Sequence, residues 1–240
     1  MSFGPGPMSQ AMQAIVGANV LLFFGQLLTD SQPWGLTETL GLQPAAVVGS
    51  LRVWQLATYM FLHAGVFHIV FNMLALWMFG TELEQRWGTP YFLKFYFVTG
   101  IGAGVLTVIV SMLPFGIAAQ LYRSNIIGAS GAVYGLLLAY ALYFPDRIIY
   151  FNFLFPIPVK YYVLIIGLIA FYSSLGAQGG VANVTHLGGL LVAYLFLRGG
   201  RVHPLAELKY RYTKWKIMRM RSKFDVYSGG RSNDWDRRIH

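Results

Sequence analysis

The segment Phe95–Tyr122, FYFVTGIGAGVLTVIVSMLPFGIAAQLY, contains no Asp, Glu, Lys or Arg, and neither does the segment Val53–Thr81. Each segment is longer than the run of about 20 apolar residues with which a helix crosses a lipid bilayer. Hydrophobic residues make up 56% of the 240-residue chain and charged residues 11%, whereas soluble domains contain about 25% charged residues. The sequence therefore predicts an all-α polytopic membrane protein.

Six membrane spans account for the apolar stretches of the chain. The stretch Tyr161–Leu197 carries no formal charge, and as one helix it would be about 55 Å long, too long for a hydrocarbon core of about 30 Å. Gly176, Gly179 and Gly180 interrupt it, so we expect two spans there. The six expected spans cover approximately residues 11–29, 67–80, 91–113, 127–144, 161–174 and 184–197.

The net charge of +9 is concentrated at the C-terminal end. Residues 1–197 contain six basic and five acidic residues, whereas residues 198–240 contain twelve basic and four acidic residues. Basic residues beside a span remain in the cytoplasm, and an even number of spans places both termini there. The sequence thus predicts a short cytoplasmic N-terminus (1–10), a six-helix membrane domain (11–197) and a basic cytoplasmic tail (198–240). We expect the tail to orient the chain and contact anionic lipids, and not to bind nucleic acid, since no nucleic-acid motif accompanies its charge.

Two other sequence signals are absent. The chain has no cysteine, which excludes disulfides and thiolate chemistry. The first basic residue is Arg52, whereas a signal peptide begins with a positively charged region. We therefore expect Ala14–Leu28 to belong to a retained first span.

Polar residues occur at the start of the second, fourth and sixth expected spans. Buried polar groups in a membrane are costly and usually mark a functional site. Because even-numbered spans all begin at the outer face, the three clusters are expected at one depth, in the outer half of the bilayer. They are His63, His68 and Asn72; Ser130 within Gly128-Ala129-Ser130-Gly131; and His186 after Asn183-Val184-Thr185.

Ser130 and His186 are the residue types of a nucleophile and its base. A neutral imidazole takes the hydroxyl proton during attack and returns it to the leaving amine. No acidic residue lies at a matching depth, so a Ser-His dyad is favoured over a triad, with Tyr134, one helical turn after Ser130, stacked on the imidazole. The alternative is structural, because serine, glycine and histidine in spans also serve helix packing through hydrogen bonds and close approach.

Small residues surround both members of this pair. Gly128 and Gly131 flank Ser130 and leave its hydroxyl accessible, while Gly189 and Ala193 follow His186 on the same helical face. Residues of this size let two helices approach closely. The sixth span is therefore expected to pack against the fourth.

His68 and Asn72 are four residues apart and share one helical face. Their side chains, together with the Ser130 backbone N–H, are candidate donors to the oxyanion of a tetrahedral intermediate. His63 falls off that face and is expected to shape the loop or the water entrance. A metal site at His63 and His68 is disfavoured, because no carboxylate or cysteine accompanies them, and ordinary interhelical hydrogen bonding is the other alternative. We expect no metal and no cofactor.

These motifs resemble those of the rhomboid intramembrane serine proteases over approximately residues 54–193. The resemblance implies a six-helix core, Ser130 as nucleophile, His186 as base, His68 and Asn72 in an oxyanion hole, and a fifth span that moves to admit substrate. It rests on four motifs in order along the chain: His63-x4-His68-x3-Asn72, Leu83-Glu84-Gln85-Arg86-Trp87-Gly88, Gly128-Ala129-Ser130-Gly131-Ala132-Val133-Tyr134 and His186-Leu187-Gly188-Gly189.

The resulting hypothesis is a serine endopeptidase of a bacterial inner membrane. Its substrates would be single-span or multi-span membrane proteins in the lipid bilayer, cut near the outer face where a helix unwinds locally. A rhomboid-like pseudoprotease that binds membrane proteins without cutting them is the main alternative. A transporter or channel is disfavoured, because its polar residues would be distributed across the full membrane thickness.

Overall fold

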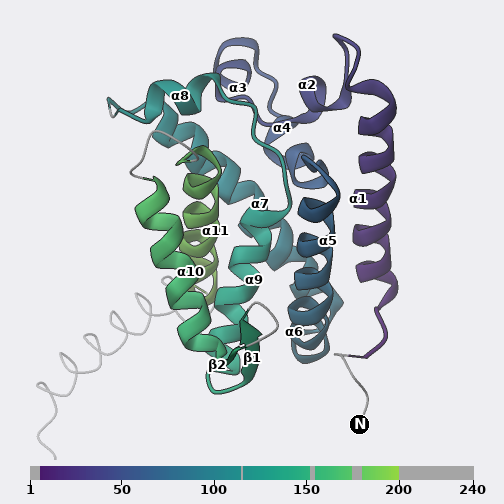
Figure 1. The fold of residues 1–240 in the computed structure, drawn as a ribbon, viewed down its shortest axis with the longest axis vertical. Helices are drawn as coiled ribbons and strands as arrows, with labels where there is room; N and C mark the ends of the chain where they lie inside the picture. Colours follow the sequence, from purple (N-terminus) through teal and green to yellow (C-terminus); the bar gives the residue numbers. More distant parts are fainter. Residues whose placement is uncertain (1–5, 115, 152–154, 175–179, 200–240) are drawn as a thin grey trace, which may run out of the picture. The chain divides into compact units, whose positions relative to one another are not determined.

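The computed structural model describes residues 6–114, 116–151, 155–174 and 180–199, which are mostly helical. Met1–Arg198 forms one compact unit. Most of the predicted basic tail, residues 200–240, and the interrupting glycines Gly176 and Gly179 lie outside the described residues. Figure 1 shows the elements of the helical bundle in chain order.

Six helical segments correspond to the six expected spans. The second is composite, since a π-helical turn joins α5 to α6 without a break. The segments are α1 (Gln10–Thr29), α5 (Val66–Ala75) with η2 (Leu76–Gly80) and α6 (Thr81–Trp87), α7 (Thr89–Ser111), α9 (Ser130–Tyr143), α10 (Val159–Ser174) and α11 (Gly180–Gly199).

Three of these segments are long and apolar enough to cross a membrane. They are Gln10–Thr29, Val66–Trp87 and Thr89–Ser111, while α9 and α10 are apolar but shorter. A span needs about 20 residues to cross the hydrocarbon core, and α9 has 14. The described residues therefore establish three helices that are both long and apolar enough to cross a membrane, and the six-span count remains a prediction.

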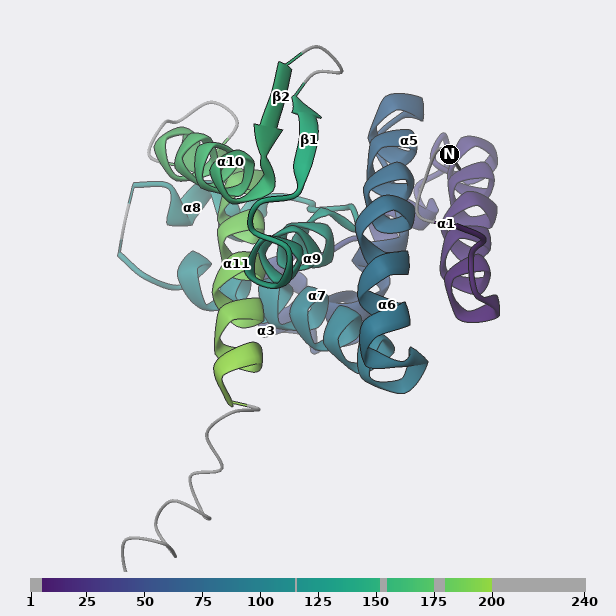
Figure 2. The ribbon, with the colours of Figure 1, turned by 90° about the horizontal axis from the view of Figure 1, so that it is seen from below.

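The short helix α9 occupies the centre of the bundle. Figures 1 and 2 both show it between α5 and α10, with α7 and α11 beside it. Nine of its 14 residues are buried. A methyl group on Gly189 would lie 2.0 Å from the carbonyl oxygen of Gly131, and one on Gly135 would lie 3.2 Å from Cβ of Ala193. Small residues on both helices thus bring α11 against α9.

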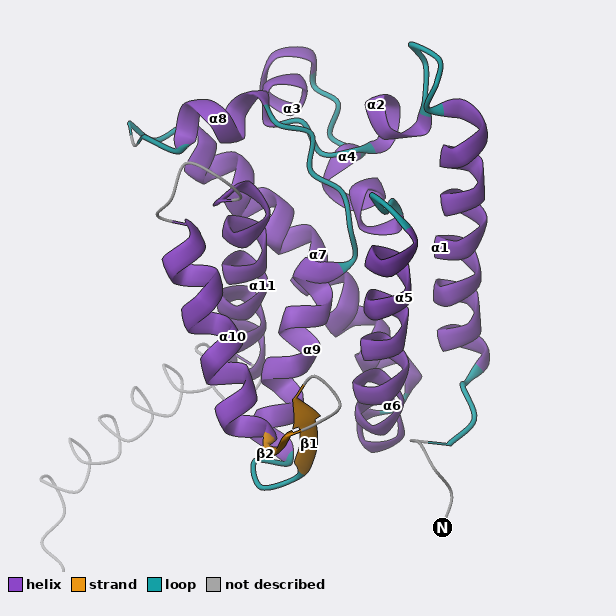
Figure 3. Cartoon of the chain, viewed as in Figure 1, coloured by secondary structure: helices purple, strands orange, loops and turns teal. Residues whose placement is uncertain are grey.

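Irregular structure lies at the two ends of the bundle, as Figure 3 shows. At one end, short helices fold the segment between α1 and α5. Leu42 in this segment exchanges both backbone hydrogen bonds with Ile126, each 2.9 Å long. This pairing fixes the strand-like approach to Gly128 and α9. The short helices of this end are α2 (Leu36–Leu40), α3 (Pro44–Ser50), α4 (Gln55–Thr58), η1 (Tyr59–Phe61) and α8 (Ala118–Arg123).

At the other end, a β-hairpin corrects the all-α prediction. Strands β1 (Ile148–Phe151) and β2 (Phe155–Pro158) pair antiparallel, with Ile149 opposite Ile157. Isoleucine, tyrosine and phenylalanine favour strands, and the prolines at 156 and 158 prevent a continuous helix between α9 and α10. The hairpin therefore connects these two helices.

Glu84 lies four residues past the expected end of the second span (67–80), yet it is helical, in α6, and buried. Its carboxylate accepts hydrogen bonds from Oγ of Ser9, 2.8 Å away, and from Oγ1 of Thr89, 2.6 Å away. These bonds offset the cost of burying the carboxylate, so the helix continues past residue 80. Glu84 thereby joins the starts of α1 and α7.

Candidate active site

The side chains of Ser130 and His186 meet where α9 contacts α11. Oγ of Ser130 lies 2.8 Å from Nε2 of His186, within hydrogen-bond distance. Ser130 is the first residue of α9, and the contact between Gly131 and Gly189 lies directly beside the pair. A hydroxyl at this distance can donate its proton to a neutral imidazole that is protonated on Nδ1. The arrangement is that of a nucleophile and a general base.

The imidazole of His186 is held by a ring contact. The Tyr134 ring stacks on it with 4.3 Å between centroids and 7° between planes. Nδ1 of His186 is buried and has no hydrogen-bond partner among the described residues. No carboxylate therefore orients this ring, and the stack with Tyr134 together with helix packing performs that task.

The His68 ring and the Ser130 hydroxyl both lie close to Gly128. A methyl group on Gly128 would lie 2.9 Å from Nε2 of His68 and 3.6 Å from Oγ of Ser130. Nδ1 of His68 accepts the backbone N–H of Ala64 at 3.2 Å. The imidazole proton is therefore on Nε2, where it can donate into the space beside Ser130.

Gly128 makes this proximity possible in two ways. Its φ of +128° lies in a region that side-chain-bearing residues rarely adopt. Its backbone N–H donates to the carbonyl of Tyr59 at 2.9 Å, which fixes the turn before α9. The absence of a side chain leaves room for the His68 ring. Any larger residue here would strain the turn and displace His68.

Asn72 and His63 lie on different sides of His68. Asn72 is buried, borders the cavity beside Ser130, and uses one amide N–H to bond the His68 carbonyl at 2.9 Å. The second amide N–H is a further donor for a bound oxyanion. His63 is not part of this cavity: its ring makes an edge-to-face contact with His68, with 5.0 Å between centroids and 70° between planes.

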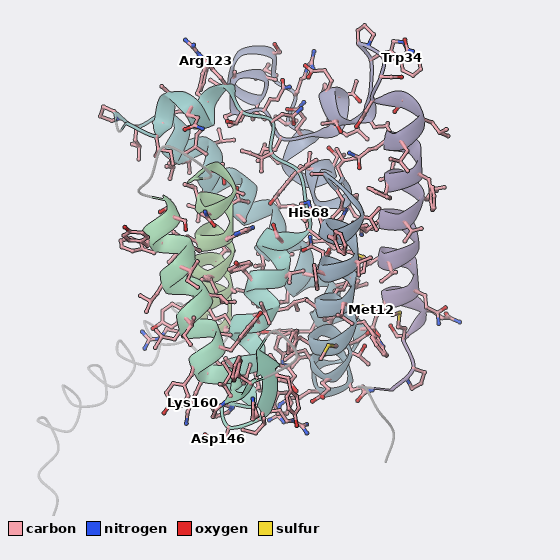
Figure 4. All side chains as sticks on the ribbon, viewed as in Figure 1. Met12, Trp34, His68, Arg123, Asp146 and Lys160 are labelled. Carbon is pink, nitrogen blue, oxygen red and sulfur yellow. The ribbon has the colours of Figure 1, made fainter. Side chains whose placement is uncertain are left out.

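A cavity of about 320 Å³ opens between α5, α9 and α10. Its polar residues are His68, Asn72, Ser130, Tyr134 and Tyr162, and the remaining lining is aliphatic and aromatic. Figure 4 shows His68 inside the bundle, nearer to the end that carries Trp34 and Arg123 than to the end that carries Asp146 and Lys160. The site is therefore a largely apolar pocket, and His68 lies in the half of the bundle that carries Trp34 and Arg123.

Sequence reasoning did not identify two polar contacts near the site. Oγ1 of Thr107 in α7 lies 2.9 Å from Oγ1 of Thr185, the residue before His186, and both threonines are buried. Gln26 of α1 accepts the backbone N–H of His63 at 2.8 Å. A polar residue inside an apolar span was the available signal in each case. The partners lie 78 and 37 residues away, so the sequence alone does not reveal the contacts.

The part of the chain that contains these residues is similar to a known protein family. Residues 50–200 match a family model described as Rhomboid domain. The chain is 33% identical over 156 residues to RHOMBOID-like protein 6, mitochondrial, of Arabidopsis thaliana, covering 62% of this chain and 44% of the relative. It is 31% identical over 181 residues to Rhomboid protease GluP of Bacillus subtilis (strain 168), covering 73% of this chain and 32% of the relative.

A third relative is Rhomboid protease AarA of Providencia stuartii. The two are 31% identical over 153 residues, covering 59% of this chain and 54% of the relative. The matched region thus spans about a third to a half of the length of these relatives. All four site motifs begin and end within the part that matches the family model.

Proposed function

The chain belongs to the rhomboid family, and from this premise we propose that it is an intramembrane serine endopeptidase that cuts transmembrane helices with a Ser130–His186 dyad. The observation that carries the proposal is the 2.8 Å separation between Oγ of Ser130 and Nε2 of His186. Relatives named as rhomboid proteases support an intramembrane protease at the level of the family. The dyad and the oxyanion donors are our own assignment for this chain.

In the first chemical step, Oγ of Ser130 attacks the carbonyl carbon of the scissile peptide bond. Nε2 of His186 takes the hydroxyl proton, and the carbonyl oxygen becomes an oxyanion. Its donors are Nε2–H of His68, the amide of Asn72 and the backbone N–H of Ser130. Because Ser130 is the first residue of α9, that N–H has no partner within the helix, and the positive end of the helix dipole also faces the oxyanion.

The intermediate then collapses as His186 returns its proton to the leaving amine, which breaks the peptide bond and leaves an ester on Ser130. Water attacks this ester while His186 takes one of its protons. Collapse of the second intermediate returns that proton to Oγ of Ser130 and releases the carboxylate product. No step needs a metal or a cofactor.

The substrate would enter from the lipid through the apolar cavity between α5 and α10. A spanning helix has all its backbone groups hydrogen-bonded, so it must unwind locally before Ser130 can reach a carbonyl. We therefore propose substrates among single-span and multi-span membrane proteins, with helix-destabilising residues near the cut. Outward movement of α10 would widen the cavity for a peptide chain.

The chain is an integral membrane protein, with three helices of membrane length among its described residues. We propose a bacterial inner membrane, with residues 1–10 and the basic tail 198–240 in the cytoplasm and the membrane domain at 11–197. In this orientation the end of the bundle that carries Trp34 and Arg123 is the outer end. Cleavage would then occur near the outer face of the membrane.

The test is cleavage of a single-span substrate with an unstable helix by the purified protein in lipid vesicles. We expect Ser130→Ala and His186→Ala each to abolish cleavage while the protein remains folded. Ser111→Ala is the matched control, because Ser111 is buried and bonds only the Val108 carbonyl of its own helix among the described contacts. Cleavage that survives Ser130→Ala would disprove the dyad. Binding without cleavage of several unstable helices by the wild-type protein would favour the pseudoprotease.

A further inference from the structure

Gln26 is a buried glutamine in the membrane-length helix α1, with 4% of its surface exposed. Its Oε1 accepts the backbone N–H of His63 at 2.8 Å, and its Nε2 donates to Oγ1 of Thr37 at 2.7 Å. A buried amide is costly unless both of its polar atoms are bonded. Gln26 meets this condition through residues outside its own helix. It lies before residues 50–200, which match the family model.

The bond from Gln26 reaches the His68 imidazole through two successive peptide groups. Gln26 fixes the N–H of His63, and the next N–H, that of Ala64, donates to Nδ1 of His68. This second bond determines that the proton of His68 is on Nε2, beside Ser130. The short segment His63–Gly65 is not helical, so its position depends on bonds from outside.

The position of the His63 ring depends on the same segment, His63–Gly65. It is buried and contacts the His68 ring edge to face, an arrangement favoured between aromatic rings. Neither ring nitrogen has a hydrogen-bond partner among the described residues. The ring is therefore positioned by its backbone, which Gln26 holds.

Packing does not replace this hydrogen bond. A cavity of about 440 Å³, distinct from the one beside Ser130, lies against Gln26, His63 and Ala64. The cavity leaves room for the His63–Gly65 segment to move, so packing alone does not fix its position. Thr37, the second partner of Gln26, is itself held in place, because its N–H donates to Oδ1 of Asp30 at 2.9 Å and its carbonyl accepts Nδ2–H of Asn125 at 2.8 Å.

We propose that Gln26 is a positioning residue for the oxyanion site: it holds the Leu62–His63 peptide group, and through it the adjoining Ala64 N–H, so that His68 presents Nε2–H to the Ser130 side of the cavity. This inference rests on the proposed function. It makes α1 a support of the active site in addition to a membrane anchor. Loss of an oxyanion donor typically lowers kcat by about 10²–10³, and misplacement through Gln26 should cost less, about 10-fold in kcat with an unchanged KM.

Three variants separate this role from helix packing. Gln26→Met keeps the length of the side chain but removes its acceptor and donor. Gln26→Glu keeps an acceptor oxygen for the His63 N–H and should retain kcat within about threefold. Asn19→Leu is the matched control, because Asn19 is also buried in α1 but bonds only the Ile15 carbonyl of its own helix. It should retain wild-type kcat.

The experiment combines cleavage kinetics in lipid with NMR of the protein labelled with ¹⁵N-histidine. We expect Gln26→Met to shift the ring resonances of His63 and His68 and to lower kcat about 10-fold. In a His68→Ala background the same substitution should not lower kcat further, because both substitutions act through the His68 imidazole. Unmoved resonances with wild-type kcat, or an equal loss in Asn19→Leu, would overturn the positioning role. Shifted resonances in a protein that shows no Ser130-dependent cleavage would instead refute the proposed function.

Discussion

Replacement of Gly189 by alanine tests whether the α9–α11 contact assembles the proposed dyad. The new methyl carbon would lie 2.0 Å from the Gly131 carbonyl oxygen, whereas folded proteins essentially never place a Cβ within 3.0 Å of a neighbour. The two helices must therefore separate by about 1 Å. Movement of α11 straight away from α9 would lengthen the Ser130–His186 contact from 2.8 Å to about 3.8 Å, beyond hydrogen-bond range.

A misplacement of about 1 Å costs about 10²-fold in rate, or about 2.7 kcal/mol of transition-state stabilisation. We therefore expect Gly189→Ala to lower kcat about 100-fold and to slow labelling of Ser130 by a fluorophosphonate probe by a similar factor. Both rates are measured on purified protein in lipid. Gly17→Ala in α1 is the control, because a methyl group there meets no atom within 4 Å.

The thermal unfolding of the variant separates misalignment from unfolding. Alanine within a helix is more favourable than glycine by roughly 0.5–1 kcal/mol, which partly offsets the steric cost, so the variant should remain folded. A folded Gly189→Ala protein with kcat within twofold of wild type would refute the reasoning, because the dyad would then not depend on this contact. Loss of activity only together with unfolding would also contradict it.

Four further substitutions, at three positions, test other parts of the site. Gly128→Ala should lower kcat at least about 10²-fold, because the residue has a φ of +128° and the new methyl group would lie 2.9 Å from the His68 ring. Wild-type kinetics for this variant would contradict the prediction. Tyr134→Phe should keep kcat within about twofold, whereas Tyr134→Leu should lower kcat about 10-fold, because the ring stack on His186 contributes about 0.5–1.5 kcal/mol. Equal kcat values for the two variants would show that the stack does not contribute to catalysis. Thr185→Val should lower the free energy of unfolding by about 1–2 kcal/mol, because it leaves the buried Thr107 hydroxyl without its interhelical partner, and an unchanged unfolding midpoint would show that this bond contributes nothing.

The long helices were predictable because lipid selects for uninterrupted apolar composition. The first expected span, 11–29, agrees with α1 (Gln10–Thr29) within one residue at each end. The second was expected to end at residue 80 but continues to Trp87, because the acidic residues after Gly80 find partners in distant segments: Glu82 pairs with Arg147 at 3.0 Å, and Glu84 bonds Ser9, 75 residues away. Such partners are not visible in a local pattern.

The candidate site also combines features that the local sequence predicts with features that depend on distant contacts. Residue type and spacing predicted the polar side chains that the structure brings together, with Ser130 beside His186 and His68 close to both. The resemblance to the rhomboid family is confirmed by the family match. The catalytic roles stay predictions. Neither the positive φ of Gly128 nor the bond from Gln26 to His63 has a local signature, since the first depends on the Tyr59 carbonyl and the second on a contact across 37 residues.

The two members of the proposed dyad come from helices that are far apart in the order of synthesis. His186 follows Ser130 by 56 residues, and the helix that carries it is the last one described. At a translation rate of about 5–20 residues per second, the ribosome adds these residues in roughly 3 to 11 s. During that interval the nascent chain has a serine but no base. With the proposed dyad, the chain would therefore be unable to cut neighbouring membrane proteins, or its own unfinished spans, until α11 has docked against Gly131.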